Sequence, residues 1–224
     1  MTFSIAARCE RTGAFGVAVS SSSPAVAARC AFARRGVGAA CSQNITNPQL
    51  GPAMLDRLAE GDSAQDALDS VAAGEGFSAY RQLSVVDASG NAATFSGDKT
   101  LGTHAGATGP NVAAAGNLLS SAQIPQLMVD DFARTDDLRL EERLLSVLRV
   151  ALAAGGEAGP VHSVGLLVIG DAPWPVTDLR VDFHDDPIGE LGRLWELWQP
   201  QAADYITRGL DPRLAPAYGV PGDE

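Results

Sequence analysis

The sequence predicts an α+β fold, a four-layer αββα sandwich in which two antiparallel sheets are stacked face to face between helices. Strand-like segments near the N-terminus carry small or apolar residues on both faces, as strands that are covered on both sides do. Strand-like and helix-like segments also occur in groups, which disfavours the alternation of a parallel βαβ sheet. The 224 residues contain no linker, repeat or low-complexity stretch, so a single domain is expected.

The chain is expected to open with three strands. In residues 2–8, Phe3 and Ile5 fall on one face and Thr2 and Ser4 on the other. A turn at Gly13 then leads into a second alternating segment. A third segment has the same small and apolar character. These strands are expected at residues 2–8, 14–23 and 36–44.

Helices and further strands follow in groups. Apolar residues recur every three to four positions in the helical segments, and Pro52, Ser63 and Ser121 stand at three of the helix starts. Alternating or continuous apolar runs indicate the strands. Helices are expected at about 52–60, 63–73, 121–134, 140–154 and from 186, and strands at 81–87, 91–97, 111–117, 162–170 and 176–183.

The C-terminal part is expected to add to the same domain. Residues 1–186 form the predicted sandwich, and residues 187–224 add a helix and a tail packed on it, the tail from about residue 209 wrapping over the surface. Trp195 and Trp198 lie one turn apart on the helix, which favours packing or a contact between copies of the chain. We therefore expect a homo-oligomer, with a dimer favoured.

Composition excludes several classes of function. A net charge of −11 disfavours nucleic acid as a partner, because phosphate binding needs a basic surface. No apolar stretch reaches the ~18 residues of a membrane span, and the start lacks a signal-peptide pattern, so we expect a cytoplasmic protein. Three cysteines without a CxxC pair and three scattered histidines predict neither a disulfide framework nor a metal site. No phosphate-binding glycine motif occurs, and no cofactor is expected.

Basic residues gather at the start of this acidic chain. The first 55 positions hold five arginines, Arg34 among them, and a single acid, Glu10. Such a segment could line a site for an anionic small-molecule substrate, and Arg34 is a candidate for binding it. The alternative is that these arginines pair with acids elsewhere in the chain. Lysine occurs once, at Lys99, so no mechanism that needs two lysines can operate.

A hydroxyl residue stands at the start of the first strand. Removal of Met1 would leave Thr2 with a free α-amine beside its own Oγ. An α-amine has a reference pKa of about 7.7–8.0, so near neutrality part of it is unprotonated and can act as a base. One residue would then supply both nucleophile and general base, without any histidine.

Several blocks of the sequence resemble one family over nearly the whole chain. TFSIAAR, TGAFGVAVSSSSPAV, RQLSVVDASGNAATFSG and the ending LDPRLAPAYGVPGDE closely resemble the domain-of-unknown-function-1028 family of bacterial proteins. That family is grouped with the Ntn (N-terminal nucleophile) hydrolases, whose fold is the αββα sandwich. The resemblance implies this fold and places Thr2 at the position of the nucleophile. It implies no particular substrate.

The resemblance also shows a departure. The block GVAVSSSS is similar to a proteasome-type run in which an aspartate supports the catalytic lysine, but Ser22 stands at that position and no lysine precedes Lys99. Either another group sets the pKa of the amine, or the site has lost its catalytic function. Ser20, Ser21 and Ser22 could bond the amine or a ligand, and Ser20 and Ser22 are our substrate-binding candidates. The alternative is that they are solvated ends of a strand.

Amide side chains are candidates for stabilising an oxyanion. Related hydrolases place such donors where the third strand ends, and Gln43 and Asn44 stand there. Asn117 leads from a predicted strand towards a helix and is a third candidate. The alternative for each amide is capping of a strand end or helix start.

Two further residues are substrate-binding candidates. Arg81 could bind a substrate carboxylate with two hydrogen bonds, although a salt bridge is its default role. His104 lies in a glycine-rich loop and could touch a ligand, although a structural role is favoured.

Two functions of different classes fit these residues. The first is an Ntn-type amidohydrolase that cleaves a C–N bond, amide or carbamoyl, of a small metabolite through Thr2 Oγ. The second is a non-catalytic ligand-binding or scaffolding protein that keeps the fold after losing the chemistry. Ser22 and the missing lysine favour the second, whereas Thr2 and the amides favour the first.

Overall fold

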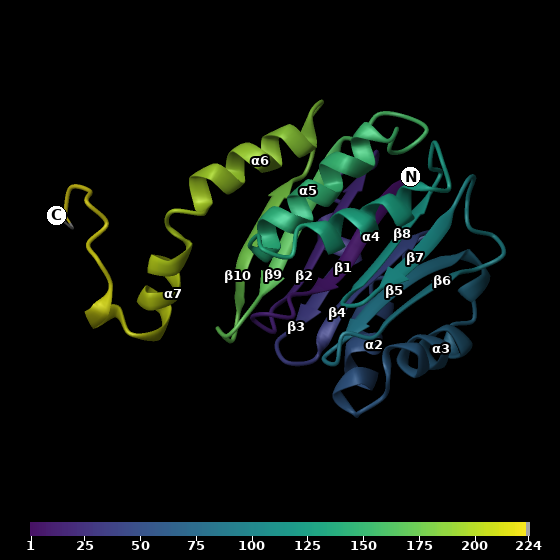
Figure 1. Ribbon diagram of the computed structural model, residues 1–224, viewed down its shortest axis with the longest axis horizontal. Helices are drawn as coiled ribbons and strands as arrows, with labels where there is room; N and C mark the ends of the chain where they lie inside the picture. The colour runs from purple at the N-terminus through teal and green to yellow at the C-terminus, as the bar shows by residue number, and fades with distance from the viewer. Residues whose placement is uncertain (223–224) are drawn as a thin grey trace.

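The computed structural model describes residues 1–222 and contains two antiparallel β-sheets (Figure 1). The larger sheet has the strand order β10-β9-β2-β1-β8-β7, and the smaller sheet has the order β3-β4-β5-β6. The strands of the larger sheet are β1 (Thr2–Arg8), β2 (Phe15–Ser21), β7 (Ala105–Gly109), β8 (Val112–Asn117), β9 (Ser163–Ile169) and β10 (Pro175–Val181). Those of the smaller sheet are β3 (Ala31–Arg34), β4 (Gly38–Asn44), β5 (Arg81–Asp87) and β6 (Ala92–Ser96).

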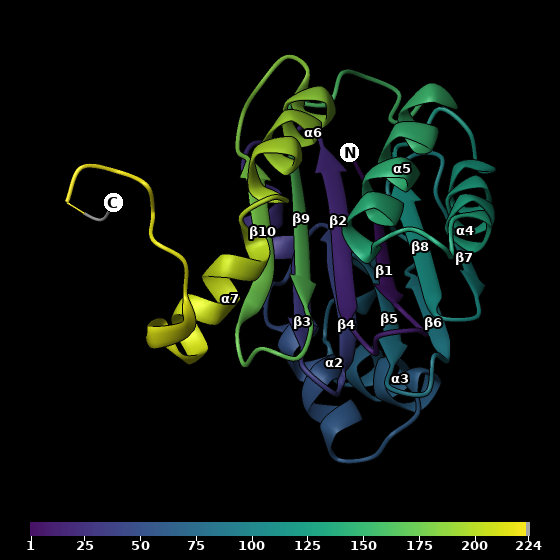
Figure 2. The same cartoon turned by 60° about the vertical axis from the view of Figure 1, so that its left-hand side comes forward.

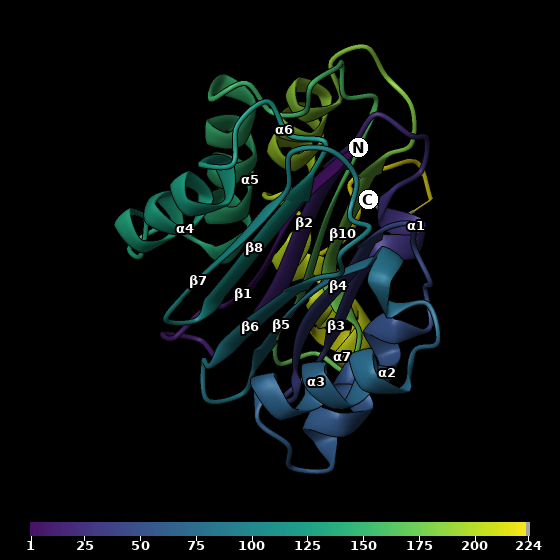
Figure 3. The same cartoon turned by 90° about the vertical axis from the view of Figure 1, so that its right-hand side faces the viewer.

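Helices lie on the outer faces of both sheets (Figure 3). The longer helices are α2 (Leu50–Ala59), α3 (Ala64–Gly74), α4 (Ile124–Arg134), α5 (Leu140–Ala153), α6 (Pro187–Trp198) and α7 (Ala202–Leu210), and α1 (Ala27–Cys30) is a single turn. The helices α2 and α3 pack on the smaller sheet, and α4, α5 and α6 on the larger one. Ser63 starts α3 as predicted, because its side chain accepts the Asp66 N–H.

The alternation of β1 decides which residues enter which layer. Phe3 and Ile5 point towards the helices and share a core with Leu144 and Leu148 of α5. Ala6, on the opposite face, belongs to a second core that lies between the two sheets and contains mainly small residues. Strands buried on both faces were predicted from this composition, and the burial of β1 and β2 bears that out.

Four of the α-helices and strands were not predicted from the sequence. The structure adds α1, the short strand β3 before β4, β7 before β8, and α7 after α6. The β7 segment, Ala-Gly-Ala-Thr-Gly, has almost no strand propensity and is extended because it pairs along β8 from Ala105 to Gly109. The third predicted strand begins at Gly38 rather than Gly36, because the residues before it form the turn from β3.

The C-terminal segment leaves the two sheets. The helix α6 packs on β9 and β10, whereas α7 and the residues after it lead away from the body (Figure 2). We expected the tail to cover the surface, but its side chains from residue 209 to 222 are largely exposed, and α7 buries only Ala202. Within residues 1–222, no helix is both long and apolar enough to span a bilayer.

Candidate functional site

Thr2 is the first residue of β1 and lies between the neighbouring strands β2 and β8 of the larger sheet. Its backbone is opposite Ser21 of β2 on one side and Asn117 of β8 on the other. Residues opposed in an antiparallel pair point to the same face of the sheet, so all three side chains face the smaller sheet. The Thr2 Oγ1 donates to the Met1 carbonyl oxygen at 2.6 Å and lies 3.3 Å from Ser21 Oγ. Ser21 Oγ donates to the same carbonyl oxygen.

A network of buried amides lies beside Thr2 and joins the sheets. Ser4 Oγ donates to Gln43 Oε1 at 2.6 Å, and Gln43 Nε2 donates to Gln82 Oε1 at 2.8 Å. Asn117 Nδ2 donates to the same Gln82 oxygen at 3.0 Å, and Gln82 Nε2 donates to the Gly116 carbonyl at 2.9 Å. Gln82 thus connects two predicted site residues, although the sequence analysis did not select it.

Two amide nitrogens of this network each have one hydrogen that their bond to Gln82 does not use. An amide nitrogen carries two hydrogens, and the bond to Gln82 uses one hydrogen each of Gln43 and Asn117. Because all three amides are almost fully buried, their orientations are fixed by their partners. Fixed amide donors close to a hydroxyl nucleophile are what the stabilisation of an oxyanion requires.

Glu157, from a loop far along the chain, also lies near Thr2, beside the end of β2. The Glu157 side chain is 4% exposed, and its Oε2 accepts the Ser22 N–H at 3.1 Å. Its Oε1 is buried and has no hydrogen-bond partner among the described residues. Burial raises the pKa of Glu157 to about 7, and the positive charge of the chain's α-amine acts in the opposite direction. No sequence pattern links Glu157 to Thr2, so the sequence analysis missed it.

Comparison with known proteins identifies the family of this chain. A family model described as a family of unknown function, DUF1028, matches residues 2–191. The chain belongs to this family. The matched DUF1028 segment contains Thr2, the amide network and Glu157, whereas α7 and the tail lie beyond it.

Solved structures similar to this DUF1028 chain include a protein of the same family and a more distant one. The protein SPO2555 from Silicibacter pomeroyi, of the same family model, is 32% identical, with a TM-score of 0.84 over 92% of this chain and 90% of that chain. Anbu (ancestral beta-subunit) from Yersinia bercovieri is 12% identical, with a TM-score of 0.41 over 91% of this chain and 97% of that chain. No curated protein matches the chain.

Among the other predicted residues, Asn44 and Arg81 hold loops of the DUF1028 chain in place. Asn44 has a positive φ of 72°, and its Nδ2 donates to the Tyr80 carbonyl at 2.6 Å. Arg81 forms an ion pair of 3.1 Å with Glu75, in which both side chains are about 90% buried. Hydrogen bonds from Asn47 and Arg81 lower the pKa of Glu75. The default role of Arg81 as a salt-bridge partner is therefore the one that the structure shows.

Ser20 and Ser22 do not present their hydroxyls to Thr2 in the way we expected. Ser20 pairs with Phe3 in the sheet, so its side chain lies on the helix-facing side and donates to the Ser163 carbonyl at 3.2 Å. Ser21 takes the position beside Thr2, because successive side chains of a strand point to opposite faces. Ser22 contributes its backbone N–H to Glu157.

Arg34 and His104 are also bound elsewhere. Arg34 lies at the Gly38 end of the β3–β4 ladder, away from Gln43, and forms an exposed ion pair of 2.7 Å with Asp56. The exposed ring of His104 has its Nδ1 2.9 Å from the Gly102 carbonyl oxygen. The ion pair keeps Arg34 away from Thr2, whereas His104 directly precedes β7, whose first residue Ala105 pairs with Gly116, next to Asn117.

Among the remaining chemistry-bearing residues, the His162 N–H donates to the carbonyl of Ser21, the residue opposite Thr2, at 2.8 Å. Lys99 donates to the Tyr80 hydroxyl at 3.0 Å on an exposed loop. The three cysteines are buried and free. Across residues 1–222, no three His, Cys, Asp or Glu side chains come together in a group that could hold a metal ion.

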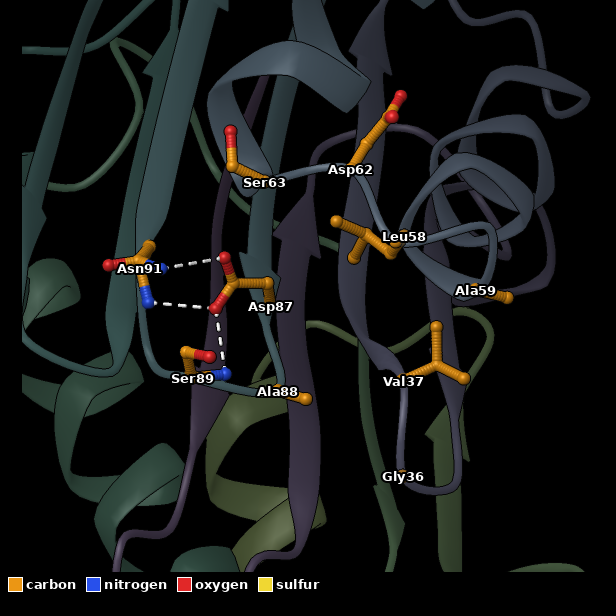
Figure 4. A pocket seen from close by; sticks show the side chains of 11 residues that line it. Gly36, Val37, Leu58, Ala59, Asp62, Ser63, Asp87, Ala88, Ser89 and Asn91 are labelled. Carbon is orange, nitrogen blue, oxygen red and sulfur yellow. Dashed lines mark hydrogen bonds between the residues drawn. The ribbon is translucent and has the colours of Figure 1, made fainter.

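A cavity of about 480 Å³ opens at the other end of the smaller sheet, between the end of α2 and the β5–β6 turn (Figure 4). Asp87 lies in it and accepts the N–H groups of Ser89 and Asn91, together with Asn91 Nδ2. It also accepts the Ala64 N–H at the start of α3. Its carboxylate is thus occupied by a turn and a helix start, and we assign the cavity no role in the Thr2 site.

Proposed function

We propose that this DUF1028 chain is an Ntn-type amidohydrolase that uses Thr2 as its nucleophile once Met1 has been removed. The observation that carries this proposal is the position of Thr2, directly opposite Asn117 at the end of β1 and beside the network of Gln43 and Gln82. A hydroxyl nucleophile and buried amide donors are thus assembled from strands of both sheets. The outer helices favour the αββα sandwich that the family resemblance implies.

The chemistry follows from these groups. The Thr2 Oγ–H proton passes to the lone pair of the Thr2 α-amine while Oγ forms a bond to the substrate carbonyl carbon. The carbonyl electrons move onto the oxygen, which accepts hydrogen bonds from the amides of Gln43 and Asn117. The ammonium returns its proton to the leaving nitrogen as the C–N bond breaks. Water then hydrolyses the ester on Thr2, with the amine again acting as base.

The substrate that we propose is a small metabolite with an amide or carbamoyl group. The arginine excess near the N-terminus favours an anionic one, although the arginine candidates Arg34 and Arg81 are already engaged in ion pairs. We retain the cytoplasmic dimer as part of the proposal. The exposed apolar side chains of the C-terminal segment, such as Leu210 and Leu214, support a contact between copies.

The second candidate function is a ligand-binding protein without catalysis. While Met1 is attached, the Thr2 nitrogen belongs to a peptide bond and cannot act as a base. Thr2 is also only 6% exposed, and its hydroxyl is bonded to the Met1 carbonyl. Retention of Met1 in the native host would favour this alternative.

Intact mass and turnover together test the proposal. Protein from the native host is expected to lack Met1, and a panel of acyl, carbamoyl and lactam amides is expected to include a substrate. Thr2→Ala should abolish its turnover, because it removes the nucleophile but leaves a small residue at the new N-terminus. Thr2→Ser should retain part of the rate. Thr207→Ala on α7, remote from the site, should leave it unchanged. Turnover that survives Thr2→Ala would refute the mechanism.

A further inference from the structure

Glu157 is held against the end of β8, the strand that pairs with Thr2. The residues on either side of it are fixed by backbone bonds to residues 118–120, from Ser120 N–H to the Gly156 carbonyl at 3.0 Å and from Ala158 N–H to the Leu118 carbonyl at 2.9 Å. Glu157 itself forms a β-bridge with Leu119. The loop is thus anchored two residues beyond Asn117, which lies opposite Thr2.

The N-terminus of the chain lies at this loop. The methyl end of the Met1 side chain lies over Gly159, where an added Cβ would come within 3.1 Å of it. The groups that act on the Glu157 carboxyl are the α-amine and the N–H and hydroxyl of Ser22. The α-amine is the cation whose charge lowers the pKa of this carboxyl, and the same charge lowers the pKa of the Cys30 thiol.

One oxygen of Glu157 lacks a partner that its burial demands. Oε2 is bonded to the Ser22 N–H, but Oε1 is buried without a hydrogen bond among residues 1–222. An unpaired buried carboxylate oxygen is costly, and such atoms in a folded protein call for an explanation in terms of a donor or a role. A donor at the chain's N-terminus would satisfy it.

We propose that Glu157 is the positioning residue for the α-amine of Thr2, its Oε1 accepting an amine N–H so that the amine lone pair is directed at Thr2 Oγ. This inference rests on the proposed function, because the amine is free only after removal of Met1. When the amine takes the Oγ proton, the carboxylate stabilises the ammonium that forms, as the aspartate of a Ser-His-Asp triad stabilises its imidazolium. Glu157 thereby supplies the support that a lysine and an aspartate give in proteasome-type sites.

The test needs no substrate. In processed protein lacking Met1, the acetylation rate of the α-amine is measured by mass spectrometry as a function of pH, which gives the apparent pKa of the amine. Loss of a neighbouring carboxylate should lower it, so Glu157→Gln is expected to shift the profile by about one pH unit to lower pH. Glu10→Gln removes an exposed acid from the turn between β1 and β2, at the opposite end of β1 from Thr2, and should leave the acetylation profile unchanged.

Equal apparent pKa values in the wild type and Glu157→Gln would overturn the inference. Glu157→Gln keeps the side-chain size and removes a buried charge, so it is expected to fold. If Glu157→Gln does not fold, Glu157→Asp provides a second comparison, because its shorter side chain moves the carboxylate away from the amine. An acetylation profile identical to that of the wild type would equally overturn the inference.

The same variants separate this inference from the proposed function. If Glu157→Gln shifts the amine profile but activity survives Thr2→Ala, the contact between Glu157 and the amine is supported and the hydrolase mechanism is refuted. If Thr2→Ala abolishes activity while Glu157→Gln leaves the amine profile unchanged, the mechanism stands and the role of Glu157 falls. For a substrate that is turned over, Glu157→Gln should lower kcat at least tenfold, with KM little changed, and move the acid limb of the pH–rate profile to lower pH.

Discussion

Ser4 Oγ on β1 donates a 2.6 Å hydrogen bond to Oε1 of Gln43 on β4, and this bond links the two sheets one pleat away from Thr2. Both side chains are almost fully buried. A polar pair at such a position destabilises the fold unless it is hydrogen-bonded further, and here Gln82 Oε1 accepts from Gln43 Nε2 and also from Asn117 Nδ2. The network therefore fixes the stacking of the sheets at the candidate site.

Gln82→Leu is expected to lower the free energy of unfolding by about 2–5 kcal/mol, because it removes the acceptor shared by Gln43 Nε2 and Asn117 Nδ2 and the side-chain donor to the Gly116 carbonyl. Urea unfolding at neutral pH measures this loss. Gln65→Leu removes only an exposed bond to Asp69 and should cost less than about 0.5 kcal/mol. Similar losses for both variants would show that the network does not hold the sheets together.

Ser21→Ala and Ser20→Ala should separate the two faces of β2. Ser21 Oγ lies 3.3 Å from Thr2 Oγ1, whereas Ser20 Oγ bonds the Ser163 carbonyl on the helix-facing side. We expect Ser21→Ala to slow turnover of an accepted amide about tenfold, the value of one hydrogen bond of about 1.4 kcal/mol. Ser20→Ala should leave turnover near that of the wild type, and the opposite order would contradict the assignment of the faces.

In the chain that retains Met1, where Glu157 Oε1 has no hydrogen-bond partner among residues 1–222, the stability of the protein should depend on the ionisation of Glu157. The pKa of this carboxyl is raised from 4.5 to about 7 on folding, chiefly by burial, so the folded state binds its proton more tightly than the unfolded state does. Stability is then greatest below about pH 4.5 and falls as the pH rises through 7, by up to about 3 kcal/mol in total. Urea midpoints between pH 4.5 and 8 should show this fall relative to Glu157→Gln, and parallel curves for the two proteins would rule it out.

Two arginine ion pairs should differ in their contribution to stability. Arg81 and Glu75 are about 90% buried, and Arg81→Met leaves the Glu75 carboxylate without its cation, at an expected cost of about 3 kcal/mol. Arg34→Met breaks an exposed pair with Asp56 and should cost less than about 1 kcal/mol. Thermal and urea unfolding of both variants measure which loses more stability. Equal losses would show that burial does not determine how much an ion pair contributes.

Much of the fold could be predicted because it depends on local patterns. The alternation of Phe3 and Ile5 with Thr2 and Ser4 predicts a strand with two covered faces, and Ser63 predicts the start of α3. The strands β3 and β7 could not be found in this way. They are short or rich in glycine, and what makes them extended is pairing with β4 and β8.

The candidate site could be predicted only in part. Thr2, Gln43 and Asn117 follow from chain position and amide chemistry, and the structure brings them to one place. The alternation of β2 does not distinguish Ser21 from the predicted Ser20 and Ser22, because it leaves open the register against β1, and a shift of one residue changes the face. Arg34 and Arg81 find partners that are far away along the chain, in Asp56 and Glu75 for example.

By itself, the sequence determined which residues of the first strands alternate, that α3 starts at Ser63, and that a hydroxyl residue heads the first strand. Only the tertiary structure decided that Gln82 joins the amides and that Glu157 accepts the Ser22 N–H, next to the residue that pairs with Thr2. The physical reason is that periodicity and capping act within a few residues. Contacts across the stacked sheets, and between a loop and a strand end, depend instead on register and layer packing, which no local pattern encodes.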